Sequence, residues 1–324
     1  MAAEPSKSPD SASSAAGVST DSAAADTPRG SRESLDPAQV AAHTIEAMQP
    51  LVSVIVPTRN SARYLARCLT SILAQSYSRI ELLVVDNKSS DGTLDLARRY
   101  TDLVSSGGPE RSAQFNLGVT RATGEFVYKV DSDFVLDPEV VMSCVKEIAK
   151  GFDAVVVHNS PDTSVGWIAK IRKFEVDMYK NDLAHSSARF VRKAVFQAVG
   201  GFDEAITAGE DYDFQNRLNR AGYRTGFIEP EALHLGEPTS FATHMYKYFK
   251  YGKDFVKYRA VNRAESKDQL RFVRGVYVRN WRHFVRHPIL GSGFAGYNVV
   301  KYLFGGLGLL VATISRSPDA TKSS

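Results

Sequence analysis

The stretch VSVIVPTRN at residues 52–60 decides the fold. Valine and isoleucine dominate its first five residues, which is typical of a strand that is buried on both faces. Pro57 ends the run, and Leu65, Leu69 and Ile72 then recur at the spacing of an amphipathic helix. A buried strand that is followed directly by such a helix predicts an α/β fold.

The same alternation continues along the chain. Further strands are expected over residues 80–85, 125–130 and 154–157, and helices over residues 94–100, over residues 112–122 and after Asp137. Strands that alternate with helices of this length predict a mostly parallel sheet with helices on both faces.

The composition excludes several classes of protein. The 324 residues include 40 Lys and Arg against 36 Asp and Glu, and 43% are hydrophobic, as in ordinary folded proteins. The only cysteines are Cys68 and Cys144, too few for a disulfide framework, so a reducing compartment is expected. Because the chain contains no uninterrupted apolar run of about 18 residues, a multi-span membrane protein is excluded.

Polar residues follow three of the predicted strands. They are Pro57, Thr58, Arg59 and Asn60 after the first strand, Asp86 after the second, and Asp131 and Asp133 after the strand over residues 125–130. Since parallel strands deliver their carboxyl ends to one edge of the sheet, these groups are expected to form a ligand site there. Asp131 and Asp133 suit Mg²⁺ or Mn²⁺. The alternative for this pair is a solvated turn that caps the next helix.

A second acidic cluster lies at Glu210, Asp211 and Asp213. If a helix begins near Glu210, Asp211 shares its apolar face and points inward, while Asp213 pairs on the solvent side with Arg217. An inward carboxylate beside a metal-phosphate pocket is a candidate general base. The alternative is that these acids only complement the helix dipole.

Two basic residues are further candidates. His234 could be a metal ligand, a phosphate contact or a structural histidine. Arg111, at the start of the helix predicted over residues 112–122, could meet phosphate or ribose, or be an ordinary surface arginine.

Five motifs in order carry a family resemblance: residues 52–60, Asp86, Asp131-Ser132-Asp133, Gly200-Gly201-Phe202-Asp203 and Gly209-Glu210-Asp211. Together they resemble a family 2 glycosyltransferase over about residues 51–240. The resemblance implies the GT-A fold, a Rossmann-like, mostly parallel α/β sheet. It also implies inverting transfer from a nucleotide sugar, assisted by Mg²⁺ or Mn²⁺.

The resemblance implies a role for each matched residue. Thr58 and Asp86 would hold the base, within a nucleotide-sugar site that also includes Pro57, Arg59, Asn60 and Arg111. Asp131 would meet the ribose or the metal, Asp133 would bind the metal, and Asp211 would deprotonate the acceptor. Gly200, Gly201, Phe202 and Glu210 would form the floor under the donor and acceptor. The QxxRW signature of processive synthases is absent after Asp211, where residues 215–218 read QNRL, so transfer of one sugar per encounter is expected.

The two ends of the chain differ from the predicted catalytic domain at residues 50–240. Residues 1–49 hold seven acids against three bases and few large apolar side chains, so a disordered tail is expected. In the helical extension at residues 241–324, residues 245–287 carry twelve Lys and Arg, interleaved with aromatic residues. The apolar run Tyr302–Ile314 has 13 residues, about 20 Å of helix against a hydrocarbon core of about 30 Å. These features favour a monotopic or re-entrant membrane anchor over a soluble helical hairpin.

The sequence therefore predicts a peripheral or monotopic glycosyltransferase at the cytoplasmic face of a membrane. Its donor would be a UDP, GDP or dTDP sugar, and its acceptor a lipid-linked sugar, a polyprenyl phosphate or an envelope glycan; a homodimer is allowed. One alternative is a catalytically silent subunit that binds nucleotide sugars. Another is a nucleic-acid-binding protein, which is disfavoured because no nucleic-acid motif accompanies the basic segment.

Overall fold

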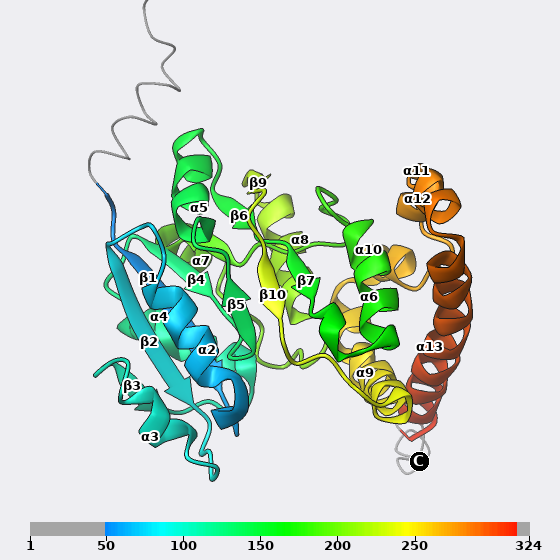
Figure 1. The fold of residues 1–324 in the computed structure, drawn as a ribbon, viewed down its shortest axis with the longest axis horizontal. Coiled ribbons are helices and arrows are strands. Elements are labelled where there is room, and N and C mark those ends of the chain that lie inside the picture. Colours follow the sequence, from blue (N-terminus) through cyan, green and yellow to red (C-terminus); the bar gives the residue numbers. More distant parts are fainter. Residues whose placement is uncertain (1–48, 316–324) are drawn as a thin grey trace, which may run out of the picture. The chain divides into compact units, whose positions relative to one another are not determined.

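The computed structural model describes residues 49–315, so the tail expected at residues 1–49 lies almost wholly outside the described residues. The central sheet has the strand order β3-β2-β1-β4-β8-β6-β9 (Figure 1). Its strands are β1 (Val52–Thr58), β2 (Ile80–Asp86), β3 (Val104–Ser106), β4 (Phe126–Lys129), β6 (Ala154–Val156), β8 (Phe190–Arg192) and β9 (Thr225–Phe227). Only β8 runs antiparallel to its neighbours, which confirms the mostly parallel sheet.

Helices cover both faces of this sheet. On one face, α2 (Ala62–Leu73), α3 (Thr93–Ala97) and α5 (Val140–Ala149) pack with Val54 and Val56 of β1. On the other face, α4 (Arg111–Arg121), α7 (Lys193–Ala198) and α8 (Glu210–Arg220) pack with Ile55 of the same strand. Alternate residues of β1 thus enter different cores, and this is why its sequence shows no polar alternation.

A second sheet, which the sequence did not predict, lies beside the carboxyl edge of the central sheet. It has the order β5-β10-β7, with strands β5 (Phe134–Leu136), β10 (Ala232–His234) and β7 (Asn159–Pro161). In the antiparallel pairing of β5 with β10, His234 lies opposite Phe134. The pairing therefore places His234 beside the turn that contains Asp131 and Asp133.

The C-terminal helices pack together and onto α6 (Trp167–Asp177), which follows the short 3-10 helix η1 (Thr163–Val165). They are α9 (Phe241–Val261), α10 (Arg263–Gln269), α11 (Gly275–Arg279), α12 (Trp281–Arg286) and α13 (Pro288–Ser315). Helices α9 and α13 cross so closely that a β-carbon at Gly308 would lie 2.0 Å from the main-chain oxygen of Phe249. The apolar run expected over residues 302–314 is the C-terminal half of α13.

Candidate active site

The ends of β1 and β2 bring two polar side chains together. The hydroxyl of Thr58 donates to the carboxylate of Asp86 over 2.9 Å, and both residues are buried. The side chain of Gln114 donates to the main-chain oxygen of Thr58 over 2.8 Å and holds the strand end in place. Arg59 and Asn60 are exposed just beyond it, and the Asn60 side-chain oxygen accepts from the Ser90 amide over 2.9 Å.

Asp131 follows β4 and is paired with Arg189, whose side chain is 12% exposed. Nη1 of Arg189 lies 2.7 Å from Oδ2 of Asp131, while Oδ1 is buried and has no hydrogen-bond partner among residues 49–315. Burial alone would raise the pKa of Asp131, but Arg189, Lys129 and Arg111 outweigh it and hold that pKa well below its usual range. Asp131 is therefore an anion with one oxygen still available to a ligand.

Asp133 and His234 form a pair at the junction of the two sheets. Nε2 of His234 lies 3.2 Å from Oδ2 of Asp133, and Nδ1 lies 2.6 Å from Oε1 of the buried Glu237. Burial opposes protonation of His234, but these two carboxylates raise its pKa. The pair requires glycine at position 236, because a β-carbon there would lie 2.0 Å from the Asp133 oxygen. Glu237 orients the imidazole, as outer-shell carboxylates do for histidines that bind metals.

Asp211 lies in the first turn of α8 and is held by two cations. Nζ of Lys129 is 2.8 Å from one carboxylate oxygen and Nη2 of Arg189 is 4.0 Å from the other. Burial raises the pKa of Asp211, but Lys129 and Arg189 lower it further than burial raises it, so the side chain is ionised at neutral pH. About a third of this side chain is exposed (29%), which leaves the carboxylate accessible from the cavity.

The neighbours of Asp211 take other roles. Glu210 is buried and accepts from Arg111 over 3.2 Å; burial and the adjacent Asp211 raise its pKa, although Arg111 opposes this. The expectation that Asp213 lies on the solvent side is wrong. Asp213 pairs with Arg217 over 2.8 Å as predicted, but it is buried because Asn262 donates to it from the C-terminal extension over 2.8 Å.

Gly200 and Gly201 precede Phe202, whose ring lies next to a residue of the site. Gly201 has a φ of +67°, and a β-carbon there would lie 2.9 Å from the side-chain oxygen of Asn116. Gly200 has a φ of +83°. The Phe202 ring is buried, and Nζ of Lys129 lies 4.7 Å from its centroid. The segment thus reaches the site through Lys129, which in turn holds Asp211.

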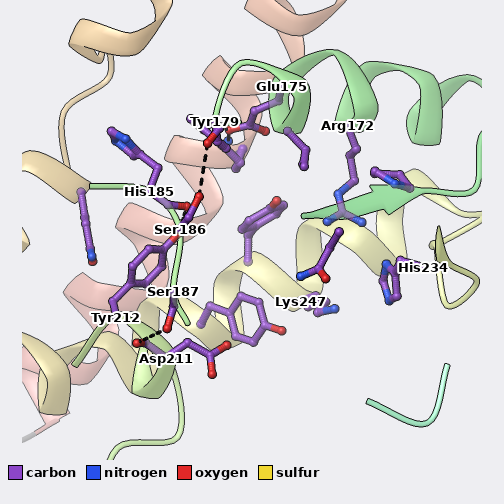
Figure 2. Close-up of a pocket in the computed structure, with 18 of the residues that line it drawn as sticks. Arg172, Glu175, Tyr179, His185, Ser186, Ser187, Asp211, Tyr212, His234 and Lys247 are labelled. Carbon is purple, nitrogen blue, oxygen red and sulfur yellow. Dashed lines mark hydrogen bonds and ion pairs between the residues drawn. The ribbon is translucent and has the colours of Figure 1, made fainter. Parts of the chain in front are cut away.

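A cavity of about 620 Å³ opens at this edge. Figure 2 shows Asp211 and Tyr212 of α8, His234 of β10, and Glu175 and Tyr179 of the α6 region arranged around it. Of the residues predicted from the sequence, its lining includes Arg111, Asp131, Asp211 and His234. Within the described chain, the remaining predicted residues lie outside the lining: Pro57, Thr58, Arg59, Asn60, Asp86, Asp133, Gly200, Gly201, Phe202 and Glu210.

Two cations at the site were not predicted. The Lys129 side chain is 1% exposed and lies in an otherwise apolar strand. Because lysine is rarely buried without a partner, a lysine in such a strand could have been identified from the sequence as a candidate site residue. Arg189 precedes the short strand β8, and nothing in its sequence neighbourhood distinguishes it from a surface arginine.

Comparisons with known proteins agree with this geometry. The model of "Glycosyl transferase family 2" matches residues 53–198, and that of "Glycosyl transferase family group 2" matches residues 126–314. Glycosyltransferase AglE of Haloferax volcanii is 28% identical over 222 residues, which are 63% of this chain and 72% of AglE. Chondroitin synthase of Pasteurella multocida is 28% identical over 190 residues, which are 53% of this chain but only 19% of the synthase.

A solved structure shares the fold. Mannosyltransferase PcManGT from Pyrobaculum calidifontis, in complex with GDP-Man and Mn²⁺, superposes with a TM-score of 0.51 at 18% identity, covering 86% of this chain and 88% of its own. The second family model alone spans more than half of the chain. On these matches and on the GT-A sheet described above, the chain belongs to glycosyltransferase family 2 and is a transferase enzyme.

Proposed function

We propose that this enzyme transfers a sugar, with inversion, from a nucleotide-diphosphate sugar of the UDP, GDP or dTDP type to an acceptor that is linked to a membrane or to the cell envelope. The observation that carries the proposal is the position of Asp211, an ionised and accessible carboxylate on the wall of the cavity that also contains Asp131. Inversion by direct displacement requires a single base. The oxygen of an acceptor hydroxyl attacks the anomeric carbon, Asp211 takes its proton, and the bond from that carbon to the diphosphate oxygen breaks.

The donor would lie along the carboxyl edge of the sheet. Thr58 and Asp86, with Pro57, Arg59 and Asn60 beside them, are proposed to hold the nucleotide, and Arg111 to contact it near the cavity. Gly200, Gly201, Phe202 and Glu210 are proposed as the floor of the site. Arg111 and Arg189 place two guanidinium groups near the edge at which negative charge develops on the leaving diphosphate.

The acidic residues fit a divalent ion such as Mg²⁺ or Mn²⁺. Asp131 has a buried oxygen without a partner, and the Asp133–His234 pair offers carboxylate and imidazole donors. No three His, Cys, Asp or Glu side chains converge on one point within residues 49–315, which agrees with an ion that takes its remaining ligands from substrate phosphates and water. We propose that two of Asp131, Asp133 and His234 hold this ion, because the three side chains do not converge on one point within residues 49–315. When bound, it neutralises the charge of the diphosphate.

Helix α13 supports an acceptor at a membrane. In the described chain, α13 is long enough and apolar enough to cross a membrane, and only 17% of its most apolar 18-residue stretch is buried. However, Lys301 near its middle is paired with Glu175 of α6 over 2.7 Å, so the N-terminal half belongs to the folded enzyme. The half beyond Lys301 spans about 21 Å, short of a full crossing. We propose a monotopic anchor, with the exposed Lys and Arg of residues 245–287, which are all of the twelve except Arg274, on the anionic cytoplasmic leaflet.

Release of nucleotide diphosphate tests the proposal. Purified enzyme is incubated with UDP-, GDP- and dTDP-sugars and Mn²⁺ or Mg²⁺, with and without a lipid extract, alongside Asp211→Asn. We expect release that requires the metal and the lipid and falls at least about 1,000-fold in the variant, consistent with loss of the essential base. Exposed Asp95→Asn is the matched control.

The same experiment separates the main alternative. A catalytically silent subunit would bind one of the nucleotide sugars without releasing its diphosphate, and Asp211→Asn would leave that binding unchanged. Such a result would remove the support for Asp211 as a base.

A further inference from the structure

The cavity extends beyond the catalytic residues into the C-terminal helices. One end is lined by Asp131 and Asp211, and the other by Tyr302, Gly305 and Leu309 of α13. The sugar donor accounts for the first end only. The second end differs from it in chemistry and is left for another part of a substrate.

A buried hydrogen-bonded cluster lines the second end. The Glu175 carboxylate accepts from Nζ of Lys301 over 2.7 Å and from the hydroxyl of Tyr179 over 2.8 Å. Nη1 of Arg274 donates to the same Tyr179 hydroxyl over 2.9 Å, and this hydroxyl also lies 2.7 Å from that of Tyr277. The cluster thus ties α6, the segment before α11, and α13 together around the cavity.

The cluster carries one more positive charge than negative. Burial raises the pKa of Glu175, but Lys301 and Arg274 bring it down to about 2, so Glu175 is ionised. Burial opposes the charge on Lys301, yet Glu175 raises its pKa, and the pKa of Tyr277 is raised to about 12, so that phenol is neutral. Glu175 therefore balances one cation, and the charge of Arg274 is left over.

Arg274 has capacity for a ligand. Its Nε is buried without a hydrogen-bond partner among the described residues, and no carboxylate among the side chains described at residues 49–267 and 269–315 lies within ion-pair distance of its guanidinium. A buried cation is costly unless an anion accompanies it. Because Arg274 and Lys301 both line the cavity, an anion inside the cavity would supply the missing charge.

We propose that Arg274, together with Lys301, forms a subsite for the phosphate or diphosphate of a lipid-linked acceptor. This inference rests on the proposed function and specifies its acceptor. The base and the subsite belong to different elements, α8 and the segment before α11. Two serines join them along the cavity wall: Ser187 donates to the main-chain oxygen of Asp211 over 2.6 Å, and Ser186 donates to the main-chain oxygen of Tyr179 over 3.2 Å (Figure 2). A substrate that uses both must carry a hydroxyl at one end and an anionic ester at the other.

The rest of the wall fits a hydrocarbon chain. Beyond the cluster, the cavity is lined by Tyr251, Phe255 and Leu309. On the same half of α13, Leu303, Leu307 and Leu310 expose between 52% and 59% of their surfaces, as is expected of a segment in contact with lipid. A lipid-linked glycosyl phosphate satisfies all three regions: the sugar hydroxyl lies at Asp211, the phosphate at Arg274 and the chain along α13.

Direct binding tests this assignment. Farnesyl diphosphate and farnesol are titrated into the full chain in EDTA, without nucleotide, for the wild type, Arg274→Gln, Arg274→Lys and Arg286→Gln. We expect Arg274→Gln to weaken farnesyl diphosphate binding roughly 10- to 100-fold, as loss of a charge-assisted hydrogen bond does, and to leave farnesol binding unchanged. Arg274→Lys should recover part of the loss, and exposed Arg286→Gln should bind as the wild type.

Several outcomes would overturn the assignment. Farnesyl diphosphate binding that is unchanged in Arg274→Gln would do so. So would binding lost equally for farnesol, or binding lost instead in Arg111→Gln, which would move the diphosphate to the donor site. Weakened attachment of Arg274→Gln to phosphatidylglycerol vesicles, with farnesyl diphosphate binding intact, would assign the cluster to membrane lipid instead.

Folding and turnover are controlled separately. Arg274→Gln leaves the Glu175–Lys301 pair in place but removes the hydrogen bonds of Arg274 to Tyr179 and Gln269, so thermal unfolding is measured for each variant and the binding is compared at a temperature where all are folded. Because the binding measurement needs no turnover, farnesyl diphosphate binding that depends on Arg274 in an enzyme that turns over no donor would contradict the proposed function alone. Conversely, donor turnover without Arg274-dependent binding would contradict the subsite alone.

Discussion

Replacing Lys129 by methionine tests how the site keeps its base ionised. The substitution keeps the apolar stem of a side chain that is 1% exposed and removes the ammonium that lies 2.8 Å from Asp211. Arg189, at 4.0 Å from Asp211, then remains as a counter-charge, while burial and the neighbouring Glu210 still disfavour the ionised form of Asp211. We therefore expect the pKa of Asp211 to rise.

The size of this rise follows from the lost contact. A hydrogen bond to a charged group contributes roughly 1.5–3 kcal/mol, which at about 1.4 kcal/mol per pKa unit corresponds to about one to two units. The acidic limb of the kcat profile should move to higher pH by that amount. Since the pKa of Asp211 is lowered in the folded enzyme, the pair stabilises the fold at neutral pH and loses this contribution as the pH falls through the lowered value.

Two assays measure these effects. The pH dependence of nucleotide diphosphate release gives the shift of the acidic limb. Urea unfolding of the wild type, Lys129→Met, Asp211→Asn and the double variant at pH about 7.5 gives the coupling energy between the two side chains. Lys150→Met is the matched control, because Lys150 pairs with Glu147 over 2.7 Å but is 61% exposed, and such pairs contribute at most about 1 kcal/mol. An unmoved acidic limb, or a coupling below about 0.5 kcal/mol, would refute the reasoning.

Three further predictions concern the framework and the metal site. Gly201→Ala should lower the free energy of unfolding by more than Gly200→Ala does. Both positions have a positive φ, which costs alanine about 1–2 kcal/mol, but only the β-carbon at position 201 would also meet a side chain, at 2.9 Å. Equal losses in urea titrations would contradict this prediction. Gly308→Ala should lower the melting temperature clearly, since its β-carbon would meet the main chain of α9 at 2.0 Å, whereas Gly306→Ala, whose β-carbon meets nothing within 4 Å, should not. His234→Ala should weaken Mn²⁺ binding in calorimetry about tenfold or more, and unchanged affinity would exclude this residue from the metal site.

Much of the sheet could be predicted because its strands are buried on both faces. Valine and isoleucine runs such as residues 52–56 have few alternatives to such a strand, and the polar residues after them mark the site edge. The second sheet was missed because its strands have three residues each, too short for a periodic signal.

The errors at the site have a tertiary origin. Helical periodicity places Asp213 opposite the apolar stripe of α8 and so predicts exposure, but Asn262, from a segment 49 residues away, covers it. Likewise, Arg189 reaches Asp131 across 58 residues, a contact that no local pattern encodes. By contrast, the roles of Thr58 and Asp86 were implied by the family resemblance and that of Asp211 by its place at a helix start, and these roles remain predictions.

The two cysteines have a practical consequence. Cys68 of α2 and Cys144 of α5 have no exposed surface, and burial raises the pKa of both thiols above the usual range. Since alkylating reagents react with exposed thiolates, the native enzyme should not react with them. A single cysteine introduced at Leu310, which is 54% exposed, would thus accept one spin label or fluorophore without prior removal of the native cysteines. Quenching of that label by a quencher placed in the bilayer would then report the depth of α13 in an otherwise unaltered chain.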